Sequence, residues 1–336
     1  MNLSERINAF LALGEQLRNL QAEEIQELAY RTLSENPWFT LDNVTFAIKG
    51  LANYLEEDKF RAWVSRYPEY KVSKKIAVVM AGNIPMVGVH DLICVLVCGH
   101  SLQVKLSSQD TFLMKYLIVK LIQIAPQIAP KIEIVEIIKD FDAVIATGSD
   151  NTARYFDYYF GKYPNIIRKN RTSVAILNGN ESSEQLARLG TDIFTYFGLG
   201  CRNVTKIYVP ENYNFTHFFE SIESYNAIAN HYKYANNYDY NKSIYLVNKV
   251  PHFDNGFLML VEKEGLFSPI SVLHYEKYAD LAALDILLKA QEEKIQCIVA
   301  DKDAFPQYFD FGKAQFPNIQ DYADGVDTMS FLTHLI

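Results

Sequence analysis

The sequence predicts an α/β protein whose parallel sheets are built from right-handed βαβ units and are preceded by a helical segment. From residue 74 onward, short β-branched apolar runs alternate with longer runs of helical period. Before that point the apolar residues recur only at helical spacing. The chain has 336 residues, 49% hydrophobic and 21% charged, so it can bury the cores of one large or two ordinary domains.

The N-terminal part is expected to be helical. Leu3 and Ile7 share one helical face, and similar spacing recurs over residues 25–33 and 44–55. The stretch SRYPEYKVSKK, residues 65–75, is expected to connect this part to the first strand.

The α/β pattern begins with the strand KKIAVVMAG and continues to residue 161. Asn83 is placed to cap the helix that follows this strand, and Pro85 suits the first turn of that helix. In a parallel sheet the ligand lies at the carboxyl ends of the strands, where this sequence has MAGNIP, KLSS and ATGS. The expected strands are 74–82, 101–108 and 132–138, and the expected helices are 84–99 and 111–126, followed by strand, turn and helix over 141–161.

A second α/β block is expected from residue 171. It opens with RTSVAILNGN, contains the helical run that ends in FGLGCRN, and includes a strand at KIQCIVA, residues 294–300. Between them lies a Tyr/Asn-rich patch, NHYKYANNYDYNKSIYLV, whose tyrosines and lysines could stack on single-stranded nucleic acid. The acidic charge of the chain favours a polar surface instead.

The overall composition excludes several classes of protein. The formal net charge of -8 argues against binding to nucleic acid or to anionic membranes. No segment approaches the ~20 uninterrupted apolar residues of a membrane span, and the N-terminus lacks the apolar core of a signal peptide. The four cysteines are too few for a secreted disulfide framework, so we expect reduced thiols and a cytoplasmic location.

Cys201 is a candidate nucleophile because it follows FGLG at a junction between helix and strand. Gly198 and Gly200 allow close approach of a ligand, and a turn can present both the thiol and its own N–H. The alternative is a helix C-cap followed by a small core residue. Spacing alone does not decide between them, because thiol reactivity depends on the surroundings.

A histidine and cysteine stripe lies in the predicted helix 84–99. His90, Cys94 and Cys98 fall at i, i+4 and i+8, with His100 just beyond. Zinc needs four converging ligands, which adjacent turns of one apolar helix rarely supply. We therefore expect no metal here, and we interpret these cysteines, like Cys297 in its strand, as small buried side chains.

The stretches KLSS and ATGSDN combine hydroxyl residues with helix N-termini, which suits phosphate or ribose. The alternative is ordinary helix capping, by Ser108 or Asp110 in the first stretch and by Ser149 or Asp150 in the second. Neither stretch is a GxGxxG or a Walker loop.

Taken in order, six pieces of the chain resemble the aldehyde dehydrogenase superfamily. Within it they are most similar to the acyl-CoA reductase family typified by the reductase subunit of bacterial fatty-acid reductase complexes. The similarity runs from about residue 70 to the C-terminus. The pieces are VVMAGNIPMVG, GHSLQVKLSS, IATGS, AILNGN, FGLGCRN and LFSP, which resemble respectively the Trp-Asn-Phe-Pro turn, the Lys-Pro-Ser stretch, Phe-Thr-Gly-Ser, Leu-Glu-Leu-Gly-Gly, the catalytic cysteine loop and Ile-Phe-Gly-Pro.

The resemblance implies a role for each matched residue. Cys201 would be the nucleophile, and the Asn83 amide, with the Cys201 N–H, would stabilise the oxyanion of a tetrahedral intermediate. The cofactor would be bound by Lys105, Ser107 and Ser108 near the adenosine ribose, by Thr147, Gly148 and Ser149 near the pyrophosphate and nicotinamide, and by Phe267 beside the nicotinamide.

Three departures from the superfamily pattern refine the expectation. Leu177 stands where hydrolytic aldehyde dehydrogenases keep the glutamate that activates water, so an acyl-cysteine would react with another thiol rather than with water. Ser108 replaces an acidic residue that holds the ribose of NAD, which favours NADPH, with NADH as the alternative. Gly265 replaces a ribose-binding glutamate, and Glu264 could substitute for it only by a one-residue shift.

The resemblance therefore implies an NADPH-dependent reductase that converts a long-chain acyl-CoA, or an acyl-protein thioester, to an aldehyde through acyl-Cys201. It further implies an aldehyde-dehydrogenase-like fold, with a Rossmann-type cofactor domain and an α/β catalytic domain. The rival functions are an aldehyde dehydrogenase running toward the acid and a non-catalytic scaffold of the same fold; homo-oligomerisation stays open. The expected parts are a helical segment 1–72, a cofactor domain 73–170, a thiol domain 171–305, and a segment 306–336 packing back on the cofactor domain.

Overall fold

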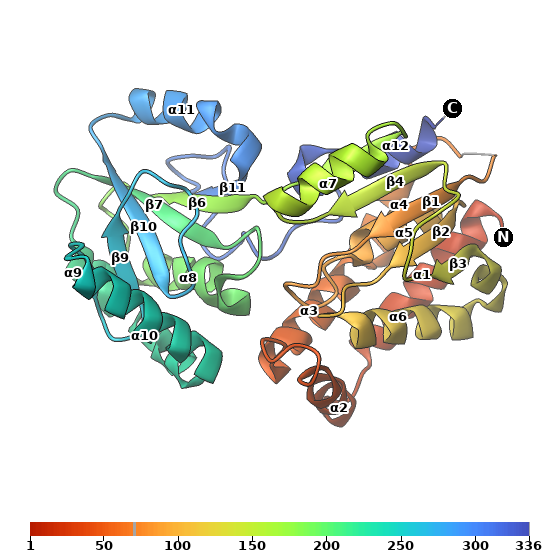
Figure 1. Ribbon diagram of the computed structural model, residues 1–336, viewed down its shortest axis with the longest axis horizontal. Coiled ribbons are helices and arrows are strands. Elements are labelled where there is room, and N and C mark those ends of the chain that lie inside the picture. The colour runs from red at the N-terminus through yellow and green to blue at the C-terminus, as the bar shows by residue number, and fades with distance from the viewer. Residues whose placement is uncertain (70–71, 336) are drawn as a thin grey trace. The chain divides into compact units, whose positions relative to one another are not determined.

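The computed structural model describes residues 1–69 and 72–335, so part of the predicted connector, residues 70–71, lies outside the described residues. The chain forms two compact units, each with its own sheet (Figure 1). Unit 1 comprises Met1–Asn170 and Asn318–Ile336, and unit 2 comprises Arg171–Pro317. No helix in the described part of the chain is long and apolar enough to cross a membrane.

The N-terminal helices of unit 1 confirm the predicted helical segment. Asn2 caps the first helix in a reciprocal capping box with Glu5, and Thr40 caps the third through the N–H of Asn43. The first and third helices bury apolar faces that include Phe10 and Ile48. The four helices are α1 (Leu3–Arg18), α2 (Ala22–Thr32), α3 (Leu41–Tyr54) and α4 (Glu57–Val64).

The sheet of unit 1 is parallel and has the order β3-β2-β1-β4-β5. The chain starts at the centre and winds outward in both directions, so α6 and α7 lie on opposite sides of the sheet (Figure 1). The elements are β1 (Lys75–Val79), α5 (Val89–Val97), β2 (Ser101–Lys105), α6 (Thr111–Ile124), η1 (Pro126–Lys131), β3 (Ile132–Ile134), β4 (Ala143–Thr147), α7 (Asp150–Phe160) and β5 (Asn165–Arg168).

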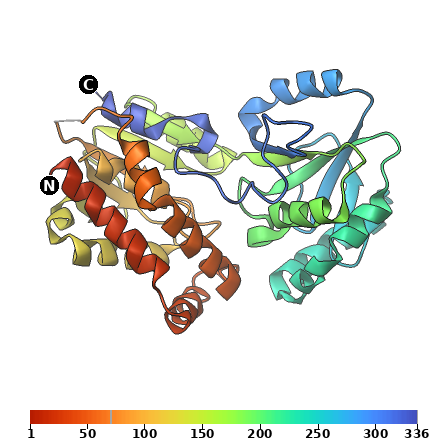
Figure 2. The same cartoon turned by 180° about the vertical axis from the view of Figure 1, so that it is seen from behind.

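The C-terminal segment returns to unit 1 as η5 (Ala323–Gly325) and α12 (Thr328–Thr333). Figure 2 shows this blue segment in the same unit as the red and orange N-terminal helices. Arg168 of β5 is buried, forms a two-pronged ion pair with Asp91 of α5, and donates to the Thr328 hydroxyl at 2.9 Å. Such a buried charge is tolerated because its guanidinium is ion-paired with the Asp91 carboxylate.

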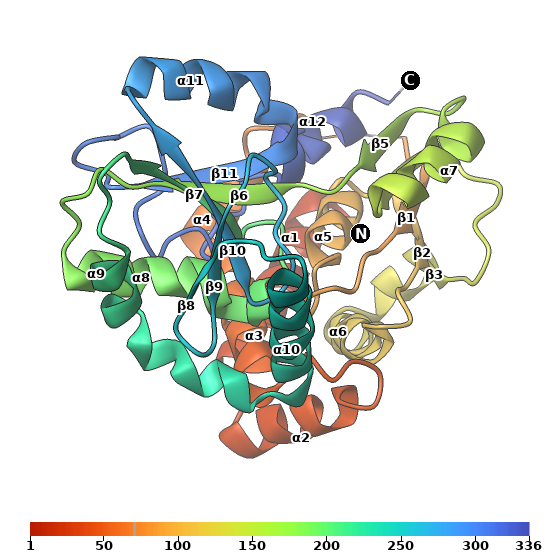
Figure 3. The same cartoon turned by 60° about the vertical axis from the view of Figure 1, so that its left-hand side comes forward.

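The sheet of unit 2 has the order β11-β6-β7-β10-β9-β8 and is parallel except for the β8–β9 pair. Helices α8 and α11 cover opposite faces of it (Figure 3). The elements are β6 (Thr172–Ile176), α8 (Ser183–Phe194), η2 (Thr195–Gly198), β7 (Val204–Pro210), α9 (Phe215–Ser221), η3 (Glu223–Asn230), α10 (Tyr232–Val247), β8 (Phe253–Asp254), β9 (Met259–Glu262), β10 (Val272–Tyr278), α11 (Leu281–Ala290), η4 (Glu292–Lys294) and β11 (Ile295–Ala300).

The predicted helix over 84–99 is wrong at its start. Helix α5 begins at Val89 with Gly88 as its N-cap, so Asn83 and Pro85 lie in the bend and turn that precede it and Asn83 caps no helix. The reason is a left-handed Met86, with φ of 57°, whose N–H is bound by the Asp110 carboxylate at 2.7 Å. This long-range contact turns the chain before the helix can begin.

Candidate active site

The carboxyl edge of the unit 1 sheet gathers most of the predicted cofactor residues. In the strand register Val79 is paired with Lys105 on one side and with Ala146 on the other, so the residues after β1, β2 and β4 emerge at one edge. The N–H of Met80 donates to the carbonyl of Lys105 at 3.0 Å, which holds the first two of these turns together. Lys105, Ser107, Ser108, Thr147, Gly148 and Ser149 all lie here, as does the Asn83 bend.

The turn that carries Asn83 is held at both ends. The Asn36 side chain donates to the carbonyl of Gly82 at 3.2 Å, and the Asp110 carboxylate accepts from the N–H of Met86 at 2.7 Å. Gly82 itself packs so closely that an added Cβ would lie 2.4 Å from the Ser107 hydroxyl oxygen. The half-buried Asn83 is therefore presented from a braced turn.

Asp110, which binds the end of this turn, is a buried carboxyl group. Burial, with an additional contribution from Glu35, raises the pKa of Asp110 to about 8. One of its oxygens, Oδ1, is buried without a hydrogen-bond partner. Asp110 occupies the N-cap position of α6 but makes no side-chain cap; Glu35 instead accepts from the N–H groups of Thr111 and Phe112 at 3.0 and 2.9 Å.

Of the predicted anion sites, the turn after β4 performs the capping role. The Ser149 hydroxyl accepts from the N–H of Thr152 at 3.3 Å and so caps α7. Ser149 is exposed and Thr147 and Gly148 are half-buried, which leaves the N-terminal end of α7 open to a ligand. Ser107 accepts from the Gln109 N–H at 3.2 Å. At the turn after β4, capping by Ser149 is thus compatible with anion binding at the N-terminal end of α7.

Cys201 lies exposed in the turn between η2 and β7, whereas Cys94, Cys98 and Cys297 are buried. The Cys201 carbonyl accepts from the Ser173 hydroxyl at 3.0 Å, and Ser173 also contacts the Cys297 sulfur at 2.9 Å. Burial raises the pKa of Cys297 to about 11, so that thiol stays protonated and inert at neutral pH.

The backbone that leads to Cys201 is strained. Tyr196 and Phe197 have φ of 54° and 58°, and Gly198 follows at 79°, so three consecutive residues occupy the left-handed region. Only glycine adopts it at no cost, and non-glycine residues each lose about 1–2 kcal/mol. Such strain persists where surrounding contacts overdetermine the conformation, and it concentrates at functional sites.

Asn203 supplies much of that constraint. Its side chain is fully buried, and its amide nitrogen reaches the carbonyls of Asp192, Ile193 and Thr195 at 3.1, 3.3 and 2.8 Å. These carbonyls belong to the end of α8 and the start of η2. Asn203 therefore replaces the backbone donors that a continuing helix would have provided.

Phe267, the residue predicted to face the nicotinamide, lies between β9 and β10 and its side chain is 45% exposed. Leu177, at the position of the missing glutamate, is 0% exposed and packs in the apolar core that includes Leu189 and Val209. Its N–H donates to the Tyr208 carbonyl at 2.9 Å. A side chain at this position faces the core of unit 2.

The histidine and cysteine stripe of α5 holds the C-terminal segment. His90 donates to the Ile319 carbonyl at 2.7 Å, and Cys98 contacts Met329 at 3.5 Å. His100 donates to the Leu332 carbonyl at 3.0 Å. Burial lowers the pKa of both histidines. Over residues 1–69 and 72–335, no group of three or more His, Cys, Asp and Glu side chains could hold a metal ion.

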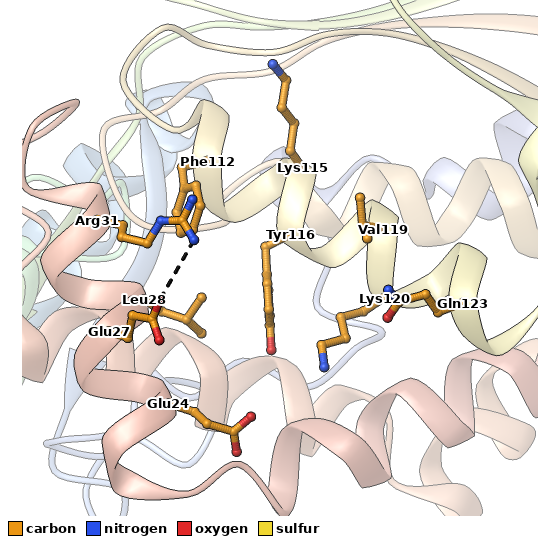
Figure 4. Close-up of a pocket in the computed structure, with 10 residues that line it drawn as sticks. All are labelled: Glu24, Glu27, Leu28, Arg31, Phe112, Lys115, Tyr116, Val119, Lys120 and Gln123. Atoms are coloured by element: carbon orange, nitrogen blue, oxygen red, sulfur yellow. Dashed lines mark ion pairs between the residues drawn. The ribbon is translucent and has the colours of Figure 1, made fainter.

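A pocket of about 530 Å³ lies between one face of α2 and one face of α6 (Figure 4). Arg31 lies over the Phe112 ring at 4.4 Å and pairs with Glu27 at 3.9 Å, and the Tyr116 ring stands between the two helices. None of the predicted site residues lines this pocket. It is therefore not part of the candidate active site.

Comparison with known proteins identifies the family. The sequence model of the acyl-CoA reductase (LuxC) family matches residues 41–227. The chain belongs to the acyl-CoA reductase family. The predicted family is thus confirmed, and membership makes the protein an NAD(P)-dependent oxidoreductase of the aldehyde group whose substrate class is an acyl thioester. No curated protein matches the sequence significantly.

Solved structures similar to this chain confirm the aldehyde dehydrogenase fold. Aldehyde dehydrogenase 21 from Physcomitrella patens matches with a TM-score of 0.69 and 13% identity over 99% of this chain and 84% of its own. An NADP-dependent enzyme from E. coli matches with a TM-score of 0.65 and 12% identity, covering 89% and 73%. NADP-dependent glyceraldehyde-3-phosphate dehydrogenase from Bacillus halodurans C-125, complexed with NADP, matches at 0.64 and 12%, covering 94% and 77%.

Proposed function

We propose that this protein uses NADPH to reduce a long-chain acyl-CoA to its aldehyde through a covalent acyl-Cys201 intermediate. The observation that carries the proposal is the contrast among the four thiols: Cys201 alone among them is exposed, and it lies on a loop braced by Asn203 and Ser173. An exposed thiol in a constrained turn is the arrangement that nucleophilic catalysis requires. The long acyl chain is proposed from the resemblance to fatty-acid reductase subunits.

The proposed chemistry begins when the Cys201 thiolate attacks the thioester carbon and CoA leaves as its thiolate, so one thioester replaces another. We propose that the Asn83 amide and the Cys201 N–H donate to the oxyanion at this stage. Donors of this kind contribute roughly 3 kcal/mol each in other enzymes. After reduction, the tetrahedral oxyanion re-forms the carbonyl, the carbon–sulfur bond breaks, and aldehyde and the Cys201 thiolate are released.

The residues at the carboxyl edge of unit 1 fit a nicotinamide dinucleotide, which supplies hydride when bound. Lys105 and Ser108 are exposed there, and residues 105–109 contain no carboxylate. A cation beside two hydroxyl groups suits a 2′-phosphate and supports NADPH over NADH. We propose that Ser107 and the Thr147–Ser149 turn bind the rest of the dinucleotide and that Phe267 packs against the nicotinamide.

The core position of Leu177 supports the reductive direction. Aldehyde oxidation requires a base that activates water against the acyl-enzyme, and the residue at that position is an aliphatic side chain in the apolar core. The acyl-cysteine is then spared from hydrolysis and is available for reduction. An acyl-CoA or acyl-protein thioester as the physiological substrate, and a cytoplasmic location, stay predictions.

The decisive experiment follows nicotinamide absorbance with purified protein, NADPH or NADH, and acyl-CoAs of graded chain length. We expect NADPH oxidation with long chains, its loss in Cys201→Ala, and its retention in Cys297→Ala, the buried thiol of the same unit. NADPH oxidation at an unchanged rate in Cys201→Ala would contradict the covalent mechanism. Turnover only with aldehyde and NAD would establish the aldehyde dehydrogenase reading instead.

A further inference from the structure

Three consecutive backbone carbonyls, those of residues 264–266, are each held by a side chain. The Lys206 ammonium donates to the first at 2.7 Å, the His274 Nδ1 to the second at 2.8 Å, and the Thr205 hydroxyl to the third at 2.7 Å. The donors come from the paired strands β7 and β10, in which Lys206 and His274 are register partners. We call these three side chains the carbonyl clamp.

Lys206 is the member of the clamp whose burial costs the most free energy. Its side chain is 0% exposed, and its ammonium is ion-paired with Glu276 and lies 4.8 Å from the centre of the Tyr208 ring. A buried ammonium destabilises a fold unless it is paired and hydrogen-bonded. Its bond to the Glu264 carbonyl is therefore charge-assisted and stronger than a neutral one.

His274 is neutral in this arrangement. Because its Nδ1 donates to a carbonyl, the proton is on that nitrogen, and Nε2 is buried without a hydrogen-bond partner. Burial lowers the pKa of His274, and the nearby Lys263 and Lys206 charges lower it further. The ring thus adds a directional contact without adding a second cation beside Lys206.

The clamp connects the two predicted functional features of unit 2. Thr205 and Lys206 are the fourth and fifth residues after Cys201, and Phe267 directly follows the last clamped carbonyl. Thr205 is also fixed from behind, since its hydroxyl contacts that of Thr172 at 2.6 Å. The segment that leaves the Cys201 turn therefore holds the segment that presents Phe267.

We infer that Lys206, His274 and Thr205 are positioning residues that fix Phe267 relative to Cys201 for hydride transfer, and that they are not needed for acylation. The inference rests on the proposed function. A bound reduced nicotinamide would supply hydride, one hydrogen with two electrons, to the acyl carbon of acyl-Cys201; the products would be the tetrahedral oxyanion still bonded to Cys201 and the oxidised nicotinamide. Acylation of Cys201 by the thioester involves no nicotinamide. Substitutions in the clamp should therefore slow hydride transfer and leave acylation unchanged.

The test compares these half-reactions in Lys206→Met/Glu276→Gln, which removes the buried ion pair without leaving an unpaired charge, and in the near-isosteric Thr205→Val. CoA release without NADPH reports acylation, and single-turnover NADPH oxidation reports hydride transfer. We expect CoA release within about twofold of wild type and hydride transfer slowed about 10- to 100-fold, the loss that a displacement of about 1 Å produces. Amide hydrogen exchange over residues 264–268 should rise in both variants without any ligand.

The matched control is Lys242→Met/Asp254→Asn. It removes another lysine–carboxylate pair of unit 2, at 2.7 Å and beside the Tyr238 ring, and the further hydrogen bonds of this pair go to Tyr238 and Gly256. It should leave both half-reactions and the exchange of residues 264–268 unchanged. Equal slowing of both half-reactions in the clamp variants, unchanged hydride transfer, or the same effects in the control would overturn the inference. Absence of CoA release from wild type would instead overturn the proposed function, and the exchange measurement would still report whether the clamp holds the loop.

Discussion

Gly200 and Asn203 bind each other on both sides of the turn that contains Cys201. The Gly200 N–H donates to the Asn203 side-chain oxygen at 2.8 Å, and the Asn203 N–H donates to the Gly200 carbonyl at 3.0 Å. Because the Asn203 amide nitrogen also reaches the end of α8, one side chain sets both the shape of the turn and its attachment to the helix.

Asn203→Ala should therefore be severely destabilising. It leaves the Gly200 N–H and several buried carbonyls unpaired, and we expect a loss of about 3 kcal/mol in the free energy of unfolding. Urea denaturation of the variant measures this loss. Asn248→Ala is the control, since that exposed side chain makes one bond, to the Ile244 carbonyl at 2.9 Å, and its loss should change stability by less than about 0.5 kcal/mol. Equal losses of unfolding free energy at both positions would show that the Asn203 network contributes no more to stability than one exposed hydrogen bond.

The native protein should present one fast-reacting thiol. Cys201 is exposed, whereas burial raises the pKa of Cys98 to about 12 and that of Cys94 well above its ordinary value. A chromogenic thiol reagent at pH 8 should label one thiol per native chain, none rapidly in Cys201→Ala, and four after denaturation. Rapid labelling of a second thiol in the native protein would contradict the structure around the α5 cysteines.

Leu177→Glu should unfold the protein rather than convert it to an aldehyde dehydrogenase. The new carboxylate would be placed in an apolar core with no partner, which costs several kcal/mol. Thermal unfolding and an assay with aldehyde and NAD measure the two outcomes. Leu177→Met, similar in volume, should lose less than about 1.5 kcal/mol. A stable Leu177→Glu variant that oxidises aldehyde would mean that position 177 faces the acyl-enzyme.

Asp110 should make the protein less stable as pH rises through the alkaline range. Its pKa is raised to about 8 by burial, so its contribution to stability is complete below the ordinary aspartate value and is lost as pH rises through 8. Asp110→Asn removes this titration while an amide oxygen can still accept from Met86. Relative to wild type, the variant should gain at least about 1 kcal/mol in the free energy of unfolding between pH 6 and pH 9.

The control for this measurement is Asp142→Asn. Asp142 is also in unit 1 and also accepts a backbone N–H, that of Lys75 at 2.7 Å, but it is exposed. The change in stability that Asp142→Asn shows over the same pH range is the background that is subtracted from the Asp110→Asn result. If the Asp110→Asn and wild-type stability curves run parallel between pH 6 and pH 9, the carboxyl group titrates in its ordinary range.

Apolar periodicity was sufficient to predict the parts of the fold whose strands are continuously apolar. Strands β1, β4 and β6 each contain an uninterrupted apolar run, and parallel topology then placed KLSS, ATGS and the Asn83 bend at one edge. Strands β9 and β10 escaped prediction because polar residues, among them His274 and Glu276, interrupt the apolar pattern of the longer one. These polar groups are tolerated there because they belong to, or neutralise, the carbonyl clamp.

The residues that brace the candidate site could not be predicted from local sequence. The side chains of Asn36 and Asp110 bind backbone groups of the Asn83 turn that are 46 and 24 residues away in the sequence. Glu35 caps α6 through the N–H of a residue 76 positions later. No local motif marks such contacts. The same absence explains the wrong capping role given to Asn83, since the cap preference of asparagine holds only if nothing distant bends the chain first.

The return of residues 318–335 to unit 1 has a consequence for how the protein is made. Unit 2 is one continuous stretch, Arg171–Pro317, and needs no distant segment of the chain to complete its core. Unit 1 begins first but must wait for Thr328 to pair Arg168 and for Leu332 to accept from His100. The part synthesised first is finished last, so a nascent chain stalled before residue 318 would expose an unfinished core to chaperones and proteases.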